Sequence, residues 1–188
     1  MKKLLASLLL ISIALFLSSC DYSAGDAPMS MGKSNAPVLI EEFSDVECPA
    51  CGYISPQVEE LARNNSDIVR LVYYHFPLSY HEFAFTGAEA TECAGDQRKG
   101  WEYLAALFEN SKNLTDDFFY SLADTLKLNA NEFKTCLDSH MKKAKIQEHL
   151  REGRARQIPG TPSIFINGEM VKWAGLEAMD AYVKDLVK

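Results

Sequence analysis

Two cysteines, Cys48 and Cys51, form a C-x-x-C pattern and are the residues best suited to chemistry in this chain. Thiols at this spacing can carry a redox couple, close a structural disulfide or supply two metal ligands. A zinc site would need two more ligands at close spacing. The next cysteines, Cys93 and Cys136, lie 42 and 85 residues beyond Cys51. The pattern therefore favours redox chemistry, with a structural disulfide or a metal site as the alternative.

The residues around the pair predict the elements that position it. Residues 38–43 form a short, largely apolar run typical of a buried strand. Pro49 suits the first turn of a helix, and apolar residues at helical spacing continue to about residue 63. This places Cys48 at the N-terminus of a helix, where unpaired N–H groups and the helix dipole stabilise a thiolate. We predict that Cys48 is the exposed nucleophile and Cys51 the buried resolving thiol.

The C-x-x-C and several other segments resemble the DsbA-like, thioredoxin-fold disulfide oxidoreductases of the bacterial envelope. The matching residues, in chain order, are Ala36-Pro37-Val38, Phe43-Ser44-Asp45-Val46-Glu47-Cys48-Pro49-Ala50-Cys51, Phe76-Pro77-Leu78, Cys93 and Gly160-Thr161-Pro162-Ser163-Ile164-Phe165-Ile166-Asn167-Gly168. The resemblance implies an α/β thioredoxin fold with an inserted all-helical subdomain. It implies neither an organic cofactor nor a metal.

The resemblance also assigns roles to three residues near the cysteines. The family has a cis proline before the third strand, packed against the active-site disulfide, and here that residue is Pro162. Together with the backbone of Thr161, it would align an extended substrate. Glu42 stands six residues before Cys48, where the family has a buried acid. Burial raises the pKa of a carboxyl group, which suits Glu42 to exchange protons with Cys51. The alternative is that Glu42 is an ordinary residue exposed at the edge of the sheet.

The domain organisation follows from the same patterns. Residues 37–78 and 157–188 are expected to form the thioredoxin fold, and residues 79–156, which have helical periodicity, the insert. Asn167-Gly168 predicts a hairpin turn after the strand at 164–166. The basic run between residues 142 and 156 is predicted to be a solvated helix face.

Cys93 and Cys136 both fall in the predicted insert. A structural disulfide between them is the preferred interpretation, and closing this loop would stabilise the fold by roughly 4 kcal/mol. A second exchanging pair that relays electrons and a pair of buried free thiols are the alternatives. The four histidines are scattered, outside the C-x-x-C, and are predicted to be surface or packed residues; they are His75, His81, His140 and His149.

The N-terminus has the pattern of an export signal. Lys2 and Lys3 precede an uncharged apolar run of 14 residues at 4–17, which is shorter than the roughly 20 residues of a spanning helix. Leu17-Ser18-Ser19-Cys20 resembles the lipobox of bacterial lipoproteins. We expect a signal peptide at 1–19, an acylated Cys20 and a flexible linker at 20–36. An uncleaved membrane anchor is the alternative.

These patterns together predict a thiol–disulfide oxidoreductase that introduces disulfides into exported proteins through Cys48 and Cys51. Its expected partners are reduced exported proteins and a membrane redox protein that reoxidises it. The net charge of −7 makes nucleic acid an unfavourable partner. We expect a monomer, lipid-anchored on the periplasmic side of the envelope, with the inner membrane favoured by Asp21.

Two other functions stay open. A reductase or isomerase of the same fold is one. The other is a redox-inert or metal-chaperone lipoprotein, which would be expected to carry a His or Met close to the cysteines. No such residue lies between Asp45 and Pro56, and this favours the enzyme.

Replacing Cys20 with Ala tests the lipid anchor. We expect Cys20→Ala to shift the protein from the membrane fraction to the soluble one, or to stall its processing, because the acyl chains that hold it would be missing. Cell fractionation followed by mass spectrometry of the mature N-terminus measures both effects. Wild-type protein recovered soluble and cleaved after another residue would contradict the lipoprotein assignment.

Overall fold

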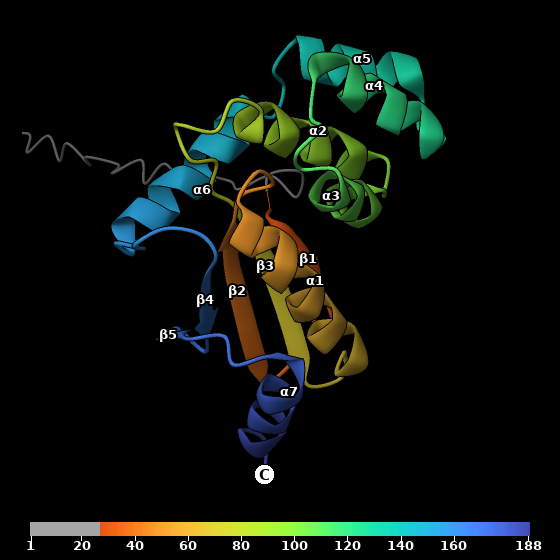
Figure 1. Ribbon diagram of the computed structural model, residues 1–188. Helices are drawn as coiled ribbons and strands as arrows, with labels where there is room; N and C mark the ends of the chain where they lie inside the picture. The colour runs from red at the N-terminus through yellow and green to blue at the C-terminus, as the bar shows by residue number, and fades with distance from the viewer. Residues whose placement is uncertain (1–26) are drawn as a thin grey trace, which may run out of the picture.

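The computed structural model describes residues 27–188, which build a mixed five-stranded sheet and seven helices (Figure 1). The elements are β1 (Met29–Met31), β2 (Val38–Ser44), α1 (Pro49–Asn64), β3 (Val69–His75), α2 (Ala84–Asp96), α3 (Gly100–Glu109), α4 (Asp116–Thr125), α5 (Ala130–Asp138), α6 (Lys143–Ala155), β4 (Ser163–Ile166), β5 (Glu169–Val171) and α7 (Leu176–Asp185). The strand order is β1-β3-β2-β4-β5. This arrangement confirms the predicted thioredoxin fold with a helical insertion.

The centre of the sheet is a parallel pair, β2 and β3, whose register runs from Val38 opposite Val69 to Ser44 opposite His75. Both strands are almost entirely buried, as expected of a parallel pair covered on its two faces. β4 pairs with β2 in the antiparallel sense. The turn to β5 places Asn167 and Gly168 at positive φ, as the sequence predicts for a tight hairpin.

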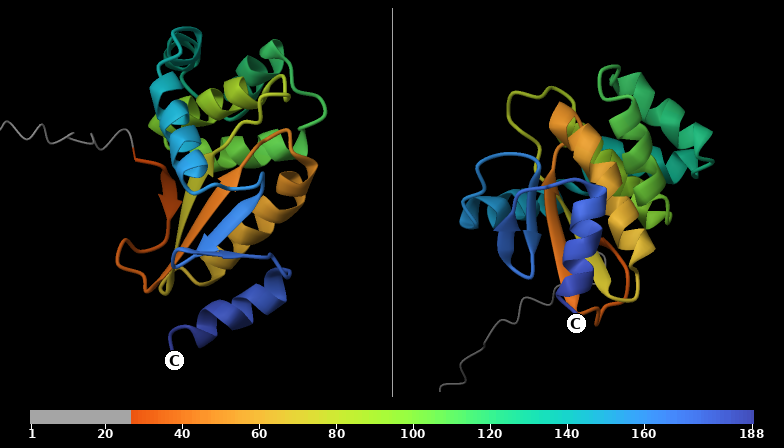
Figure 2. Two further views of the ribbon diagram at one scale, coloured as in Figure 1. Left: turned by 90° about the vertical axis from the view of Figure 1, so that its left-hand side faces the viewer. Right: turned by 60° about the horizontal axis from the view of Figure 1, so that its bottom comes forward.

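Helices α1 and α7 cover one face of the sheet (Figure 2). Their apolar side chains pack against those of the strands in one buried cluster, which includes Ile40, Leu71, Leu61, Met179 and Val183. Alternation along the strands directs Ile40 and Glu42 to this face, and Glu41 and Phe43 to the other. The N-terminal end of α1 is therefore held at the carboxyl end of β2.

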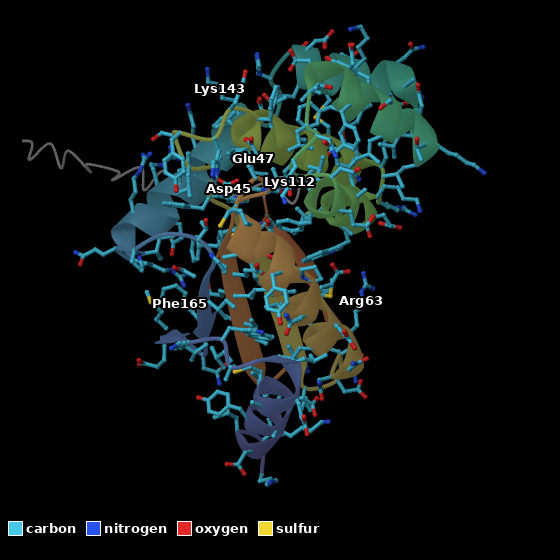
Figure 3. All side chains as sticks on the ribbon, viewed as in Figure 1. Asp45, Glu47, Arg63, Lys112, Lys143 and Phe165 are labelled. Atoms are coloured by element: carbon cyan, nitrogen blue, oxygen red, sulfur yellow. A yellow bond between two sulfur atoms is a disulfide. The ribbon has the colours of Figure 1, made fainter. Side chains whose placement is uncertain are left out.

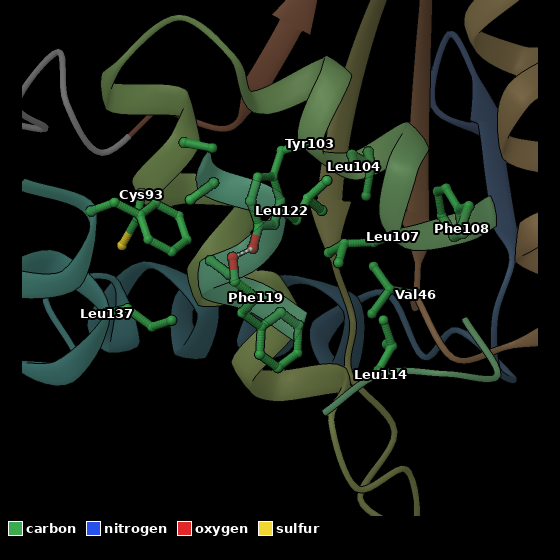
Figure 4. Close-up of a cluster of buried hydrophobic side chains, with 14 of the residues drawn as sticks. Val46, Cys93, Tyr103, Leu104, Leu107, Phe108, Leu114, Phe119, Leu122 and Leu137 are labelled. Atoms are coloured by element: carbon green, nitrogen blue, oxygen red, sulfur yellow. Dashed lines mark hydrogen bonds between the residues drawn. The ribbon is translucent and has the colours of Figure 1, made fainter. Parts of the chain in front are cut away.

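Helices α2 to α5 lie within the predicted insert and share a buried apolar core (Figure 4). Tyr103 is buried at its centre and donates a hydrogen bond to the carbonyl of Phe119 at 2.8 Å. Val46 and Tyr73 belong to the same cluster and join it to the sheet. Thr115 caps α4 by accepting a hydrogen bond from the Phe118 N–H.

A disulfide between Cys93 on α2 and Cys136 on α5 closes the insert. Both residues are buried. The bond encloses a loop with a sequence separation of 43, for which the chain-entropy account gives roughly 4 kcal/mol of stabilisation. It links the first and last helices of the α2–α5 group.

Two features differ from the sequence predictions. Met29–Met31 forms the edge strand β1, antiparallel to β3, within the segment predicted to be a linker. Such a short strand has no periodicity to detect, and its pairing comes from β3. The basic run is not wholly solvated, because Lys145 is buried against Glu92 at 2.5 Å and Arg156 forms a bidentate pair with Glu41 at 2.8 Å.

The predicted signal peptide and Cys20 lie outside the described residues. Within residues 27–188, none of the helices has both the length and the apolar character needed to cross a bilayer.

Candidate active site

The two cysteines of the C-x-x-C lie at the start of α1 as free thiols. Cys48 is the N-cap residue, and Pro49 occupies the first turn of the helix. Cys51 is fully buried, whereas Cys48 retains 8% of its accessible surface. Cys48 is thus the more accessible of the two, but less exposed than the sequence predicts. The reason is a neighbouring loop that covers it.

That loop contains Thr161 and Pro162, whose peptide bond is cis. The Cys48 thiol donates to the carbonyl oxygen of Thr161 with a separation of 3.4 Å. Pro162 immediately precedes β4, and Ser163 at the start of that strand donates to the Gly160 carbonyl at 2.7 Å. β4 itself pairs with β2, the strand that leads into the active-site loop. The sheet therefore brings residues 113 positions apart into contact.

Glu42 lies beneath the cysteines, with only 1% of its surface exposed. Burial raises its pKa from 4.5 to about 7, and hydrogen bonds from Ser55 and Ser44 oppose the rise. Burial likewise raises the pKa of Cys51 to about 12, against hydrogen bonding by Ser44. A neutral thiol and a carboxyl group that titrates near neutrality thus share one buried site. The structure does not support the alternative of an exposed Glu42.

Ser44 and Ser55 are residues that the sequence reasoning did not single out. The Ser55 hydroxyl donates to a carboxylate oxygen of Glu42, and the Ser44 and Ser55 oxygens are 2.9 Å apart. Periodicity offered a signal for both: Ser44 follows Glu42 by two residues on the same face of β2, and Ser55 follows Cys51 by one turn of α1. A polar residue at an inward-facing position of a strand or helix is therefore the sequence pattern that indicates such a buried hydrogen-bonding residue.

Asp45 and Glu47 were also missed, and they fix the active-site loop to the segment between β3 and α2. The buried Asp45 carboxylate accepts from the Leu78 N–H at 2.7 Å and contacts His81 Nδ1 at 2.8 Å. The Glu47 carboxylate accepts from the Phe83 N–H at 2.5 Å. Figure 3 shows both acids at the junction of the N-terminal end of α1 with the insert. These bonds limit movement of the loop that presents Cys48.

Two of the remaining histidines are packed away from the cysteines. His75 and His149 stack at a centroid distance of 5.8 Å, and His149 Nδ1 accepts from the His75 N–H at 3.1 Å. Burial lowers the pKa of His149 to about 3. Among residues 27–188, no group of three or more His, Cys, Asp and Glu side chains is placed to hold a metal ion.

The sequence model of the family described as Thioredoxin matches residues 25–185. The chain belongs to the thioredoxin family. Among solved structures, BdbD from Bacillus subtilis superposes with a TM-score of 0.73 at 20% identity, covering 86% of this chain and 93% of that one. DsbA2 from Pseudomonas aeruginosa superposes with a TM-score of 0.66 at 26% identity, covering 86% of this chain and 97% of that one. These likenesses confirm the fold, including the helical insertion, and the predicted resemblance to DsbA-like proteins.

Several proteins are related to this chain in sequence, and two of them represent the names that occur. One, from Bacillus cereus, is named "Probable disulfide bond formation protein D"; it is 28% identical over 154 residues, which are 75% of this chain and 70% of that protein. The other is "Na(+)/H(+) antiporter NhaA 1" of Salinispora arenicola, 34% identical over 81% of this chain but only 24% of its own length. This chain thus spans about a quarter of the length of the antiporter-named protein.

Replacing Glu42 with Gln tests the burial of a titrating acid in this thioredoxin-family site. Because the folded-state pKa of about 7 lies above the usual 4.5, wild-type stability falls as the pH rises from about 4.5 to 7. Glu42→Gln does not ionise, so its free energy of unfolding, measured by urea denaturation, should gain roughly 3 kcal/mol relative to wild type across this range. A difference between the two proteins that stays constant with pH would contradict the assignment.

Proposed function

We propose that the protein is a thiol–disulfide oxidoreductase that introduces disulfides into exported proteins through Cys48 and Cys51. The observation that carries the proposal is the placement of these thiols at the N-terminus of α1, with Cys48 against the Thr161–Pro162 loop. The name of the 28% identical Bacillus cereus protein supports the same class of reaction.

In the oxidising direction, a substrate thiolate attacks the Cys48 sulfur of the Cys48–Cys51 disulfide. A substrate–Cys48 bond forms, the bond between Cys48 and Cys51 breaks, and Cys51 leaves as a thiolate that takes up a proton. A second substrate thiolate then attacks the substrate sulfur of the mixed disulfide and releases Cys48. The substrate has lost two electrons to the enzyme. A membrane redox protein is proposed to accept these electrons and restore the disulfide.

The surroundings of Cys48 suit the attacked sulfur for this role. The helix N-terminus stabilises the thiolate that is released there. The Thr161 carbonyl, which now accepts from Cys48, lies in the loop that leads into β4 and can pair with an extended substrate in the manner of a strand. Cys51 is buried and reacts only within the protein.

The direction of the reaction is part of the proposal. Strongly oxidising members of the DsbA-like family resemble this chain except for a His at the position of Ala50. Ala50 is exposed and has no group to stabilise the thiolate, so we propose a weaker oxidant than those members. A reductase or isomerase is the second candidate, favoured by a single observation: Thr161 before the cis proline, which also resembles the isomerases.

We further propose that residues 1–19 are a signal peptide and that lipid on Cys20 holds the protein in the bacterial envelope, facing the periplasm. The first strand of the sheet, β1, begins at Met29. Eight residues therefore separate Cys20 from the sheet, which keeps the enzyme within about 30 Å of the membrane when that segment is extended. Monomeric action on reduced exported proteins completes the proposal.

Trapping of mixed disulfides tests the roles of the two cysteines. Cys51→Ser should accumulate disulfide-linked complexes with envelope proteins, because the resolving thiol is missing, whereas Cys48→Ser should accumulate essentially none. Non-reducing electrophoresis and mass spectrometry of the captured proteins measure the difference. Equal trapping by the two variants would contradict the assignment.

Equilibration with glutathione tests the direction. We expect the wild-type potential to lie above thioredoxin's value of about −270 mV, and Ala50→His to be more oxidising still. For this two-electron couple, each tenfold gain in thiolate stability corresponds to roughly 30 mV. A wild-type potential near that of thioredoxin, or no shift in the His variant, would favour the reductase.

A further inference from the structure

Helix α1 begins without a side-chain cap. Cys48 is its N-cap residue, the Cys48 side chain makes no capping hydrogen bond in the described structure, and the first turn holds no acidic residue. Unpaired N–H groups at a helix start attract negative charge. The charge that they can stabilise here is the thiolate of Cys48, provided that no carboxylate takes its place.

Two carboxylates lie in the loop directly before this helix start. Asp45 and Glu47 precede Cys48 by three residues and by one, and the Asp45 carbonyl accepts from the Cys48 N–H at 3.1 Å. Aspartate is among the residues preferred at helix N-termini, because its carboxylate accepts from the free N–H groups there. Acids at these positions compete with the Cys48 thiolate for the same donors.

Both carboxylates are instead held by the segment between β3 and α2, near the N-terminal end of α1 (Figure 3). Glu47 accepts from the Phe83 N–H at 2.5 Å. One Asp45 oxygen accepts from the Glu47 N–H at 2.8 Å. The other Asp45 oxygen accepts from the Leu78 N–H at 2.7 Å and lies 2.8 Å from His81 Nδ1. The acids nearest to the helix start therefore point their charge at other donors.

His81 is the side-chain donor among these contacts, and the others are backbone N–H groups. A carboxylate only accepts hydrogen bonds, so the hydrogen between Asp45 and His81 is on Nδ1. The Asp45 side chain is fully buried, and that of His81 is 19% exposed. The His81 N–H also donates to the Leu78 carbonyl at 3.0 Å, which closes the turn that carries the ring. The imidazole thus reaches the carboxylate from a fixed backbone.

The other groups around the thiols increase the need for such a restraint. Asp45, Glu47 and, beneath the cysteines, Glu42 are all acids, and a negative charge on any of them disfavours a thiolate. Ala50, between the cysteines, has no group that could donate to the sulfur. The Cys48 thiolate therefore depends on the start of α1.

We propose that His81 is a positioning residue for the reaction at Cys48: it holds the Asp45 carboxylate in the β3–α2 segment and so leaves the N–H groups at the start of α1 to the Cys48 thiolate. The inference rests on the proposed function, because it concerns the thiolate that attacks and leaves in disulfide exchange. It needs no contact between His81 and the substrate.

Three substitutions of His81 separate its hydrogen bond from general packing. His81→Asn keeps a donor at the position of Nδ1, because the amide nitrogen is equally many bonds from the backbone. His81→Gln moves the donor one bond further out, and His81→Ala removes it. The control is His140→Ala, which breaks another His–carboxylate contact, 2.9 Å long, between His140 Nδ1 and Glu89. The backbone donors to Asp45 remain in every variant.

Two measurements report the state of Cys48. Equilibration with glutathione gives the reduction potential, and the ultraviolet absorbance of the reduced protein at pH 7 gives the amount of thiolate. Burial raises the pKa of Cys51 to about 12, so Cys51 does not contribute to this absorbance.

We expect His81→Ala and His81→Gln to reduce the equilibrium preference for the reduced protein about tenfold, the usual effect of one hydrogen bond to a charged group. For this two-electron couple, that change is roughly 30 mV toward a weaker oxidant. The thiolate absorbance should fall as well. His81→Asn and His140→Ala should stay within about twofold of wild type. The Asn and Gln variants differ by one methylene, so their comparison stands even if the Ala variant fails to fold.

A wild-type potential in His81→Gln would overturn the inference alone, and so would a loss in His81→Asn as large as that in His81→Gln. An equal shift in His140→Ala would also overturn it, because the loss of any His–carboxylate contact would then suffice. Wild-type protein that exchanges no disulfide with glutathione would overturn the proposed function and this inference with it.

Discussion

The rest of the site depends on the burial of an acid and a thiol beneath the N-terminus of α1. Taking Glu42 and Cys51 out of water disfavours their charged forms, which raises the pKa values of both groups. This cost arises in largely apolar surroundings. Cys51 belongs to the buried cluster that the insert shares with the sheet, and Glu42 lines a cavity together with Tyr73 and Trp101. The Ser55 hydroxyl donates to the carboxylate, and the Ser44 and Ser55 hydroxyls are hydrogen-bonded to each other. A stable fold alone would be served as well by apolar residues at these positions, so the buried polar group is best understood through its chemistry.

Next to the buried Glu42 and Cys51, the backbone around Cys48 is fixed from several sides. The helix N-terminus, the cis Thr161–Pro162 loop, and the contacts of Asp45 and Glu47 come from different parts of the chain. The thioredoxin sheet supplies the first two by pairing β2 with β4. The insert supplies the last through the segment that leads into α2. A thiol carried by a backbone that is fixed from several sides keeps its position while its disulfide partners exchange.

The insert therefore does more than enlarge the protein. Its core joins that of the sheet through Val46 and Tyr73, so its packing bears directly on the active-site loop and on the wall of the cavity that Glu42 lines. The Cys93–Cys136 disulfide closes the α2–α5 group, and the ion pairs of Lys145 and Arg156 hold α6 against α2 and the sheet. These bonds keep the helices that frame the site in one arrangement.

The sequence by itself determined the strands at 38–43 and 164–166, the helix that begins at Pro49, the hairpin at Asn167-Gly168 and the location of the thiol pair. Each of these rests on local periodicity or on residues with strict backbone preferences. It also pointed to Glu42, through family resemblance. Only the tertiary structure decided the rest. β1 is a strand because β3 offers it an edge, and Cys48 is largely covered because residues 113 positions away lie against it. Ser44, Ser55, Asp45 and Glu47 acquire their roles from partners on other elements, which no pattern within a single segment of sequence records.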